Sequence, residues 1–277
     1  VLYVSTLIAT IRRIVEFAEQ FQRGMTGIER FAEIMDTPIA IADKPDAKPL
    51  EVKQGGIEFK DVSFEYPDDH NQVLHHVNLT IRPGESLALV GPSGGGKTTL
   101  CNLIPRFYDA TSGAVCIDGV DVRDMPQATL HDLMGYVPQR GVLFSGTIDS
   151  NLKFAGEHIT DEDVRTAAGI AQATEFIDAK PEGYASPIAQ GGSNVSGGQK
   201  QRLSIARSIA KKPRICLFDD SFSALDYKTD VALRRALKAQ TDNATVIIVA
   251  QRISTVLHAN RILVLDDGCI VGDGTHA

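Results

Sequence analysis

The chain has 277 residues, of which 43% are hydrophobic and 23% are charged, and its formal net charge is -7 at pH 7. This composition is ordinary for a globular protein with an ample core, and the acidic balance argues against a nucleic-acid partner. The four cysteines are widely spaced and form no C-x-x-C pair, so a metal site or a disulfide framework is not expected. Buried free thiols are expected at Cys101, Cys116, Cys216 and Cys269.

The first 35 residues predict a helix. An apolar run over residues 1–11 is shorter than the roughly 20 residues that cross a bilayer, and an amphipathic stretch follows it. Asp36-Thr37-Pro38 is a stop signal. Because the chain begins without Met, we expect a fragment, in which residues 1–36 are either the cut end of a membrane helix or a plain amphipathic helix. Prolines and a Gly-Gly pair predict a linker over residues 37–56.

Short strand-like runs then alternate with helical stretches. The first two runs predict antiparallel strands, residues 146–212 are mostly helical in pattern, and the last two runs form a hairpin. Such alternation predicts an α/β fold with a doubly wound parallel sheet, whose ligands bind at the carboxyl ends of its strands. The runs are 57–66, 73–81, 86–90, 114–117, 134–137, 214–218, 245–249, 261–265 and 269–271.

A glycine-rich loop follows the strand at 86–90 and opens onto a helix expected over 99–104, stopped by Pro105. It fits G-x-x-x-x-G-K-[ST], the pattern of phosphate-binding loops in this strand–loop–helix context. Backbone N–H groups of such a loop surround phosphates, the lysine reaches the β- and γ-phosphates, and the hydroxyl holds Mg²⁺. The loop therefore predicts a nucleoside triphosphate site with Mg²⁺, formed by Gly91, Pro92, Ser93, Gly94, Gly95, Gly96, Lys97, Thr98 and Thr99.

Two later positions extend this site. Asp219 follows an apolar strand, so its carboxylate is expected at the sheet edge beside the phosphate loop, where it can hold Mg²⁺. An acidic helix cap is the alternative there. Further back, Ser196 can cap a helix whose first residues, Gly197 and Gly198, allow a phosphate to approach closely.

Asn194 to Arg202 resembles the signature motif of ATP-binding-cassette (ABC) proteins, including Gln199. Other segments resemble motifs of the same family and occur in the same order. Tyr66 corresponds to the aromatic residue that stacks on adenine, Gln139 to the Q-loop glutamine, and Asp226 to the D-loop aspartate. The resemblance covers residues 57–277. It implies a RecA-like P-loop core, an antiparallel β subdomain, a helical subdomain at about 140–212, and ATP hydrolysis coupled to transport.

The resemblance also implies partners and a location. Residues 1–36 resemble the cytoplasmic end of the last membrane helix of an exporter-type half-transporter. In this family two cassettes dimerise head to tail, and each ATP is held by one chain's phosphate loop and the other chain's signature motif. We therefore expect a second half-transporter as partner, an inner-membrane location with the cassette on the cytoplasmic face, and a substrate chosen by membrane helices outside this sequence.

Two positions depart from the family pattern. Asp220 stands where the family has a glutamate that polarises the attacking water, and Gln251 stands where it has a switch histidine. An aspartate is one methylene shorter, and a glutamine cannot carry charge or move a proton as histidine does. Both fall in one nucleotide site, as in the degenerate half of heterodimeric exporters. The alternatives are a homodimeric exporter with two slow sites and a soluble cassette clamp acting in translation or DNA maintenance.

Overall fold

The computed structural model describes residues 2–48, 54–67, 71–240, 244–250, 256 and 259–275. The chain divides into two units, Val1–Ala42 and Asp43–Ala277. Each unit is described by itself below.

The first unit is dominated by one long helix, α1 (Leu2–Met35). All of its described side chains from Tyr3 onward are exposed, including a large set of apolar ones. The helix ends where the sequence predicts, because the residue before Pro38 is disfavoured in helical conformation. In the described parts of the chain, no helix combines the length and the apolar character that a bilayer crossing requires.

The second unit is built on a six-stranded sheet in the order β12-β11-β3-β10-β9-β6. Five of these strands are parallel, and β12 pairs antiparallel with β11 at one edge. Every residue of β9 and β10 is buried, as expected for strands covered on both faces. The strands are β3 (Ser86–Val90), β6 (Met134–Val137), β9 (Ile215–Asp219), β10 (Thr245–Val249), β11 (Arg261–Asp266) and β12 (Cys269–Gly274).

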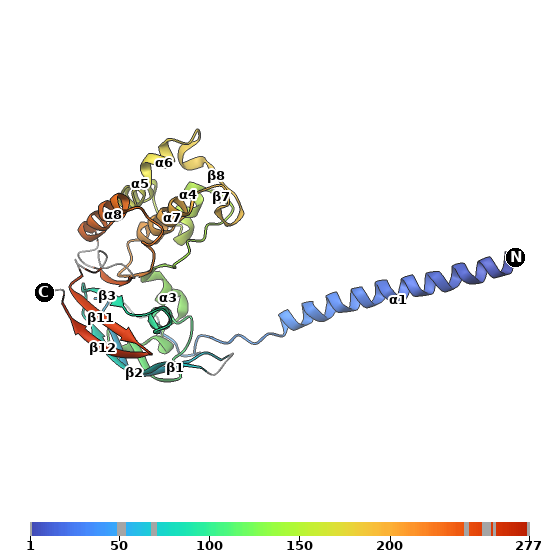
Figure 1. The fold of residues 1–277 in the computed structure, drawn as a ribbon, viewed down its shortest axis with the longest axis horizontal. Coiled ribbons are helices and arrows are strands. Elements are labelled where there is room, and N and C mark those ends of the chain that lie inside the picture. Colours follow the sequence, from blue (N-terminus) through green and yellow to red (C-terminus); the bar gives the residue numbers. More distant parts are fainter. Residues whose placement is uncertain are drawn as a thin grey trace. The chain divides into compact units, whose positions relative to one another are not determined.

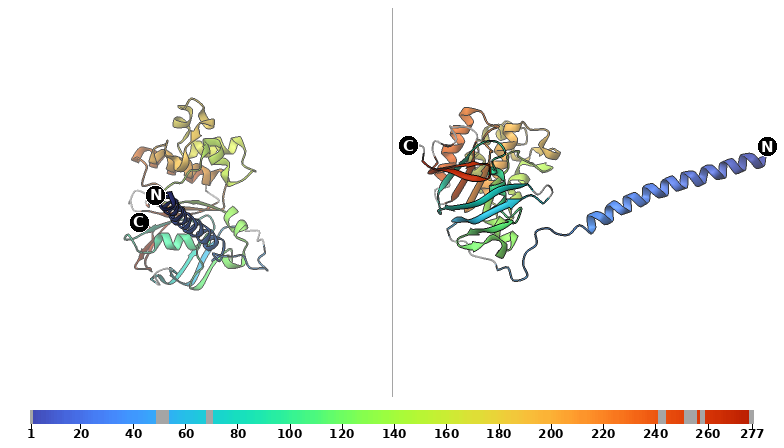
Figure 2. Two further views of the ribbon diagram at one scale, coloured as in Figure 1. Left: turned by 90° about the vertical axis from the view of Figure 1, so that its right-hand side faces the viewer. Right: turned by 60° about the horizontal axis from the view of Figure 1, so that its bottom comes forward.

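A second sheet, in the order β2-β1-β4-β5, is antiparallel throughout. It lies in the same part of the second unit as β3, β11 and β12, while the helices α4 to α8 gather at the other end (Figure 1). Two further views keep this separation of strands and helices (Figure 2). The strands are β1 (Ile57–Glu65), β2 (Gln72–Ile81), β4 (Ser112–Ile117) and β5 (Val120–Asp121).

Alternate residues of the central strands enter two different cores, because successive side chains of a strand point to opposite faces. In β10, Ile247 packs with the antiparallel sheet and α2 (Lys97–Leu103), whereas Val246 and Ile248 pack with the helices. In β9, Leu217 and Phe218 divide in the same way. The central sheet is thus the layer that both other layers share.

Three helices of the helical part begin with a capping box. Thr147, Thr160 and Ser196 each form a capping box at the first turn of a helix. The longest of the three, α7, packs against the other two and against β6. The helices and short elements here are β7 (Gly146–Thr147), α4 (Ile148–Leu152), η2 (Lys153–Ala155), α5 (Asp161–Ile170), α6 (Thr174–Asp178), η3 (Gly183–Ala185), β8 (Pro187–Ile188), η4 (Gln190–Gly192) and α7 (Gly197–Ala210).

The structure confirms the α/β class and the expected strand runs and differs in details. Helix α2 begins at Lys97 rather than Thr99, because the turn is already closed by Leu100 N–H donating to Gly96 O. Cys269 is exposed rather than buried, since it opens the edge strand β12, whereas the other three thiols are buried. The expectations did not include η1 (Val122–Asp124), α3 (Gln127–Asp132), α8 (Tyr227–Gln240) and the two-residue strands β5, β7 and β8.

Candidate functional site

The loop between β3 and α2 turns through glycines in the left-handed region, with φ of 145° at Gly91 and 93° at Gly96. A Cβ atom at Gly91 would lie 1.9 Å from the Leu265 carbonyl oxygen, and one at Gly96 would lie 2.9 Å from Leu74 Cδ2. Both positions therefore require glycine for conformation and for space. The loop backbone is consequently held close against β11 and β2.

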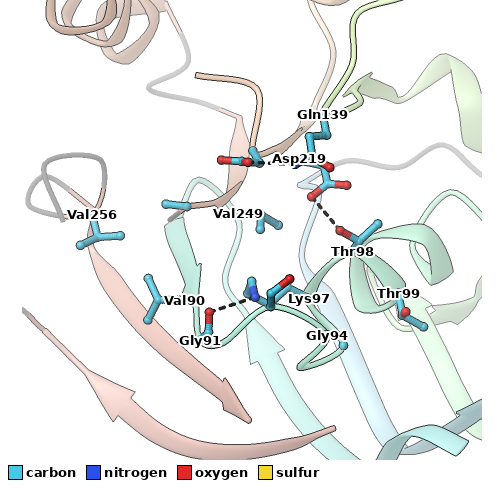
Figure 3. A pocket seen from close by; sticks show the side chains of 14 residues that line it. Val90, Gly91, Gly94, Lys97, Thr98, Thr99, Gln139, Asp219, Val249 and Val256 are labelled. Carbon is cyan, nitrogen blue, oxygen red and sulfur yellow. Dashed lines mark hydrogen bonds between the residues drawn. The ribbon is translucent and has the colours of Figure 1, made fainter. Parts of the chain in front are cut away.

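Lys97 is folded back over this loop and is 8% exposed. Its ammonium Nζ donates to the carbonyl oxygen of Gly91 at 3.0 Å (Figure 3) and to that of Pro92 at 2.6 Å. These acceptors are neutral, so they satisfy hydrogen bonds without cancelling the positive charge. The loop thus holds a charged, pre-oriented donor that is suited to an anion.

The loop borders a cavity of about 560 Å³ at the carboxyl ends of the parallel strands. This is the position where open α/β sheets bind ligands. Figure 3 shows side chains from β3, α2, β9 and β10 around it. The lining residues are Val90, Gly91, Ser93, Gly94, Gly96, Lys97, Thr98, Thr99, Gln139, Asp219, Asp220, Val249, Ala250 and Val256.

Thr98 and Asp219 meet across this cavity, although they lie 121 positions apart, with Thr98 Oγ1 donating to Asp219 Oδ1 at 3.0 Å. Asp219 is the last residue of β9 rather than the residue after the strand. Burial raises the pKa of its carboxyl; the Thr98 hydroxyl and Lys97 oppose this shift, and Asp220 adds to it. A cation at this position would favour the ionised carboxylate.

The donor set here suits Mg²⁺. Among the described residues, no group of three or more His, Cys, Asp or Glu side chains could hold a metal ion by itself. Mg²⁺ does not need such a cage, because it binds through one or two protein oxygens together with phosphate oxygens and waters. The Thr98 hydroxyl and the Asp219 carboxylate are hard oxygen donors of this kind, and both line the cavity.

Asp220 begins the turn that follows β9. Its φ is 46°, a left-handed conformation that aspartate adopts more readily than most residues. Its N–H donates to Val249 O at 3.1 Å, and Gln139 Nε2 donates to its Oδ2 at 3.1 Å. The turn therefore places the carboxylate of Asp220 at the cavity, beside the side-chain amide of Gln139. Asp220 is 8% exposed.

Gln201 on α7 supports the segment that carries Gln139, and the sequence analysis did not identify it. Its Oε1 accepts from Gly141 N–H at 2.9 Å, and its Nε2 donates to Pro138 O at 3.2 Å. Gln201 is only 2% exposed. A polar residue on the buried face of a predicted helix was the signal that could have found it, because buried amides are hydrogen-bonded.

Tyr66 lies immediately after β1 and does not line the cavity itself. Its ring packs in a cluster with Phe64 and Tyr108, and its hydroxyl forms a 2.9 Å hydrogen bond with Thr99 Oγ1. Thr99 does line the cavity. The predicted base-stacking residue is thus connected to the phosphate loop through α2.

The signature segment forms a separate feature. Ser196 caps α7, with Ser196 Oγ accepting from Gln199 N–H and Gln199 Oε1 accepting from Ser196 N–H. A Cβ atom at Gly198 would lie 3.4 Å from Ala224 O, so the start of α7 adjoins the segment that leads to Asp226, the predicted D-loop aspartate. Asp226 caps α8 by accepting from Thr229 N–H and Oγ1.

The predicted site residues therefore separate into two groups. Ser196, Gly197, Gly198, Gln199 and Asp226 are not among the residues that line the cavity. The phosphate loop, Gln139, Asp219 and Asp220 lie together around it. Gln251 lies outside the described residues.

Comparison with known proteins gives one family. The family described as "ABC transporter" matches residues 74–223. This match spans the phosphate loop, the Q-loop glutamine, the signature segment and Asp219, and it covers more than half of the chain.

Curated relatives agree. The chain is 40% identical over 276 residues to "Uncharacterized ABC transporter ATP-binding protein YwjA" of Bacillus subtilis (strain 168), covering 100% of this chain and 48% of the relative. It is 40% identical to "ATP-dependent lipid A-core flippase" of Desulfotalea psychrophila (strain LSv54 / DSM 12343), covering 96% of this chain and 46% of the relative. The chain thus spans about half the length of the curated relatives it matches.

A solved structure is similar throughout most of the chain. The "Structure of a bacterial Atm1-family ABC exporter with ATP bound" superposes with a TM-score of 0.86 at 36% identity, covering 92% of this chain and 44% of that one. The loop, the cavity, the family match and these relatives agree, and we conclude that the chain belongs to the ABC transporter family, as an ATPase domain.

Proposed function

We propose that the cavity binds ATP with Mg²⁺ and that the chain couples this binding to export. The observation that carries the proposal is the convergence of the Lys97 ammonium and the Thr98–Asp219 pair on one cavity. On binding, Lys97 exchanges its two loop carbonyls for phosphate oxygens, which are stronger, charged acceptors. Thr98, Asp219 and Gln139 would hold Mg²⁺, which would neutralise phosphate charge.

We also propose that turnover at this site is slow. Asp220 lines the cavity. Its side chain is one methylene shorter than the glutamate of the family pattern, so the attacking water is held too far from its carboxylate. Gln139 Nε2 donates to the Asp220 carboxylate at 3.1 Å and so occupies one of its oxygens. Gln251 supplies a hydrogen bond without the charge of a histidine.

The separation of the two groups of residues supports a proposed assembly of two cassettes. The start of α7, with Gly197, Gly198 and the neighbouring Asp226, serves the nucleotide of a second half-transporter, in which a competent site is completed. A heterodimer fits the losses at Asp220 and Gln251 better than a homodimer does. ATP-driven closure of the two cassettes would then switch membrane helices that lie outside this sequence.

The domain organisation belongs to the same proposal. Residues 1–36 are the cytoplasmic end of a membrane helix, residues 37–56 are a linker, and residues 57–277 are the nucleotide-binding domain with a helical subdomain at about 140–212. The cassette would face the cytoplasm at the inner membrane. The soluble clamp has no support from the relatives described above, one of which is named a flippase.

The test is binding and turnover of Mg-ATP by the whole 277-residue chain, compared with the double variant Asp220→Glu, Gln251→His. We expect the wild type to bind Mg-ATP and turn over slowly, and the double variant to be at least about tenfold faster, because the water regains a well-placed base and a proton-carrying partner. Circular dichroism controls for folding, since the glutamate introduced by Asp220→Glu must adopt the left-handed conformation of this turn.

Two results would contradict parts of this proposal. Failure of the wild type to bind Mg-ATP at millimolar concentration removes the nucleotide site. A wild-type turnover of about 10 per second, the ordinary value for enzymes, shows that Asp220 and Gln251 are adequate, and the homodimer with two equal sites then takes precedence.

A further inference from the structure

The backbone that carries Gln139 is fixed on both sides of this residue. Gln139 follows β6 and lines the cavity, where its side-chain amide donates to Asp220 Oδ2 at 3.1 Å (Figure 3). Before it, the fully buried Ser221 donates from its Oγ to the last carbonyl of β6 at 2.8 Å. After it, the N–H of Gly141 donates to Gln201 Oε1 at 2.9 Å. The Gln139 side chain is thus presented to the cavity from a short stretch of backbone that is held at both ends.

Gln201, in the second turn of α7, closes this stretch from both sides with one side chain. Besides accepting from Gly141, its amide donates from Nε2 to Pro138 O at 3.2 Å, and these two partners lie on either side of Gln139. A Cβ atom at Gly141 would lie only 3.1 Å from Gln201 Oε1, so the stretch is seated closely against the helix. A planar amide suits this position, because it offers an acceptor and a donor together. Gln201 is 2% exposed, so no solvent replaces either bond when the amide is removed.

We propose that Gln201 is a positioning residue for Gln139 and holds its side chain at the cavity. This inference rests on the proposed function, in which Gln139 would hold Mg²⁺ together with Thr98 and Asp219. A metal ligand binds well when its own supporting groups fix its orientation, and loss of these groups weakens metal binding. Affinity for Mg-ATP, but not for ATP without Mg²⁺, then depends on the two hydrogen bonds of Gln201.

A purely structural role is the competing explanation, since a buried amide also stabilises the fold. Arg207 offers a comparison within the same helix, because its Nη2 donates to Val142 O at 2.9 Å and so attaches the same segment to α7 farther from Gln139. A structural role changes the Kd for ATP equally with and without Mg²⁺ and is independent of Gln139. A positioning role changes the Kd for Mg-ATP alone, and this effect disappears once the Gln139 side chain has been removed.

The experiment is calorimetric titration of the whole chain with ATP, once in excess Mg²⁺ and once in EDTA. The variants are Gln201→Leu, which removes both hydrogen bonds, Gln139→Ala, their combination, and Arg207→Met as the matched control. We expect Gln201→Leu to raise the Kd for Mg-ATP about threefold to tenfold, the range for one net hydrogen bond. The combination should equal Gln139→Ala, and Arg207→Met and every Kd in EDTA should stay within about twofold of wild type. Hydrogen exchange over residues 138–141 should be faster in Gln201→Leu, because Gly141 loses its acceptor.

Three results would overturn the inference and leave the proposed function intact: equal losses with and without Mg²⁺, a combined loss equal to the product of the single losses, or a loss in Gln139→Ala without one in Gln201→Leu. If Gln201→Leu does not fold, Gln201→Glu decides in the same comparisons, since its carboxylate still accepts from Gly141 but cannot donate to Pro138. An unchanged Kd for Mg-ATP in Gln139→Ala removes the proposed Mg²⁺ role of Gln139 and the inference together. A wild type that binds ATP under neither condition rejects the nucleotide site itself.

Discussion

The phosphate loop and the start of α7 both present glycine backbone at the beginning of a helix, yet they differ in what surrounds them. The loop borders a cavity that also contains Asp219 and Asp220. The start of α7 is exposed at Ser196 and Gly197, and its capping box already occupies the N–H groups of Ser196 and Gln199. The phosphate loop thus lies at a cavity together with residues of its own chain, whereas the start of α7 is accessible at the surface.

This contrast teaches that the same local chemistry acquires different roles from its surroundings. Lys97 and Lys200 show it most clearly. Each ammonium donates to a backbone carbonyl in the segment that precedes its own helix, Lys97 to Pro92 at 2.6 Å and Lys200 to Gly191 at 2.7 Å. Only the first of these two lysines lines the cavity.

The largest effect is expected for Lys97→Ala. It should raise the Kd for Mg-ATP on the order of 100-fold, because it removes charge-assisted hydrogen bonds to phosphate. Lys200→Ala is the matched control, since it removes an ammonium–carbonyl bond of the same kind from the other region, and we expect less than a twofold change. Calorimetric titration of the whole chain measures both. Equal effects of the two changes on the Kd for Mg-ATP would show that the phosphate loop and the start of α7 do not differ in their role in nucleotide binding.

An intermediate effect is expected for Ser196→Ala compared with Thr160→Ala. Both remove the side chain that begins a capping box, so each should lower the free energy of unfolding by about 1 kcal/mol in urea denaturation. Neither should change the affinity of the isolated chain for Mg-ATP, because neither residue lines the cavity. Loss of ATP affinity in Ser196→Ala but not in Thr160→Ala would mean that the signature segment acts within its own chain.

The smallest effect concerns pH. The capping box of α5 contains Asp163, whose pKa is lowered by hydrogen bonds from Lys212 and Thr160, whereas that of α7 contains the neutral Gln199. A lowered folded-state pKa contributes stability above the ordinary pKa of about 4, which is lost as pH falls below it. The difference in Tm between wild type and Asp163→Asn should therefore shrink between about pH 5 and pH 3. For Gln199→Ala, which removes the neutral box, the difference should not vary with pH. A pH-independent difference for Asp163→Asn would show that its ion pair adds nothing.

The strands and the local motifs followed from the sequence because their causes are local. Continuous apolar runs predicted β3 and β10 with the bounds that the structure has. Ser196 was recognised as a helix cap because capping depends on residues three positions apart. The helix at α2 was placed two residues late, since Lys97 and Thr98 were assigned to the loop that they serve.

Contacts between distant segments could not be obtained in this way. The hydrogen bonds of Thr98 with Asp219, of Gln139 with Asp220 and of Tyr66 with Thr99 span 121, 81 and 33 positions. The first two form because β3, β10, β9 and β6 lie in that order in one sheet, and the third joins α2 to the end of β1 in the other sheet; neither arrangement is written in any single strand. The support of Gln139 by Gln201 and the exposure of Cys269 depend on the same tertiary arrangement.

The sequence by itself therefore determined the elements and the chemistry of the phosphate loop, because backbone preference, apolar periodicity and glycine at tight turns act over a few residues. The tertiary structure decided which side chains share the cavity and which remain at the surface. The physical reason is that parallel strands bring their carboxyl ends to one edge only after the sheet has assembled, and there residues more than a hundred positions apart become neighbours.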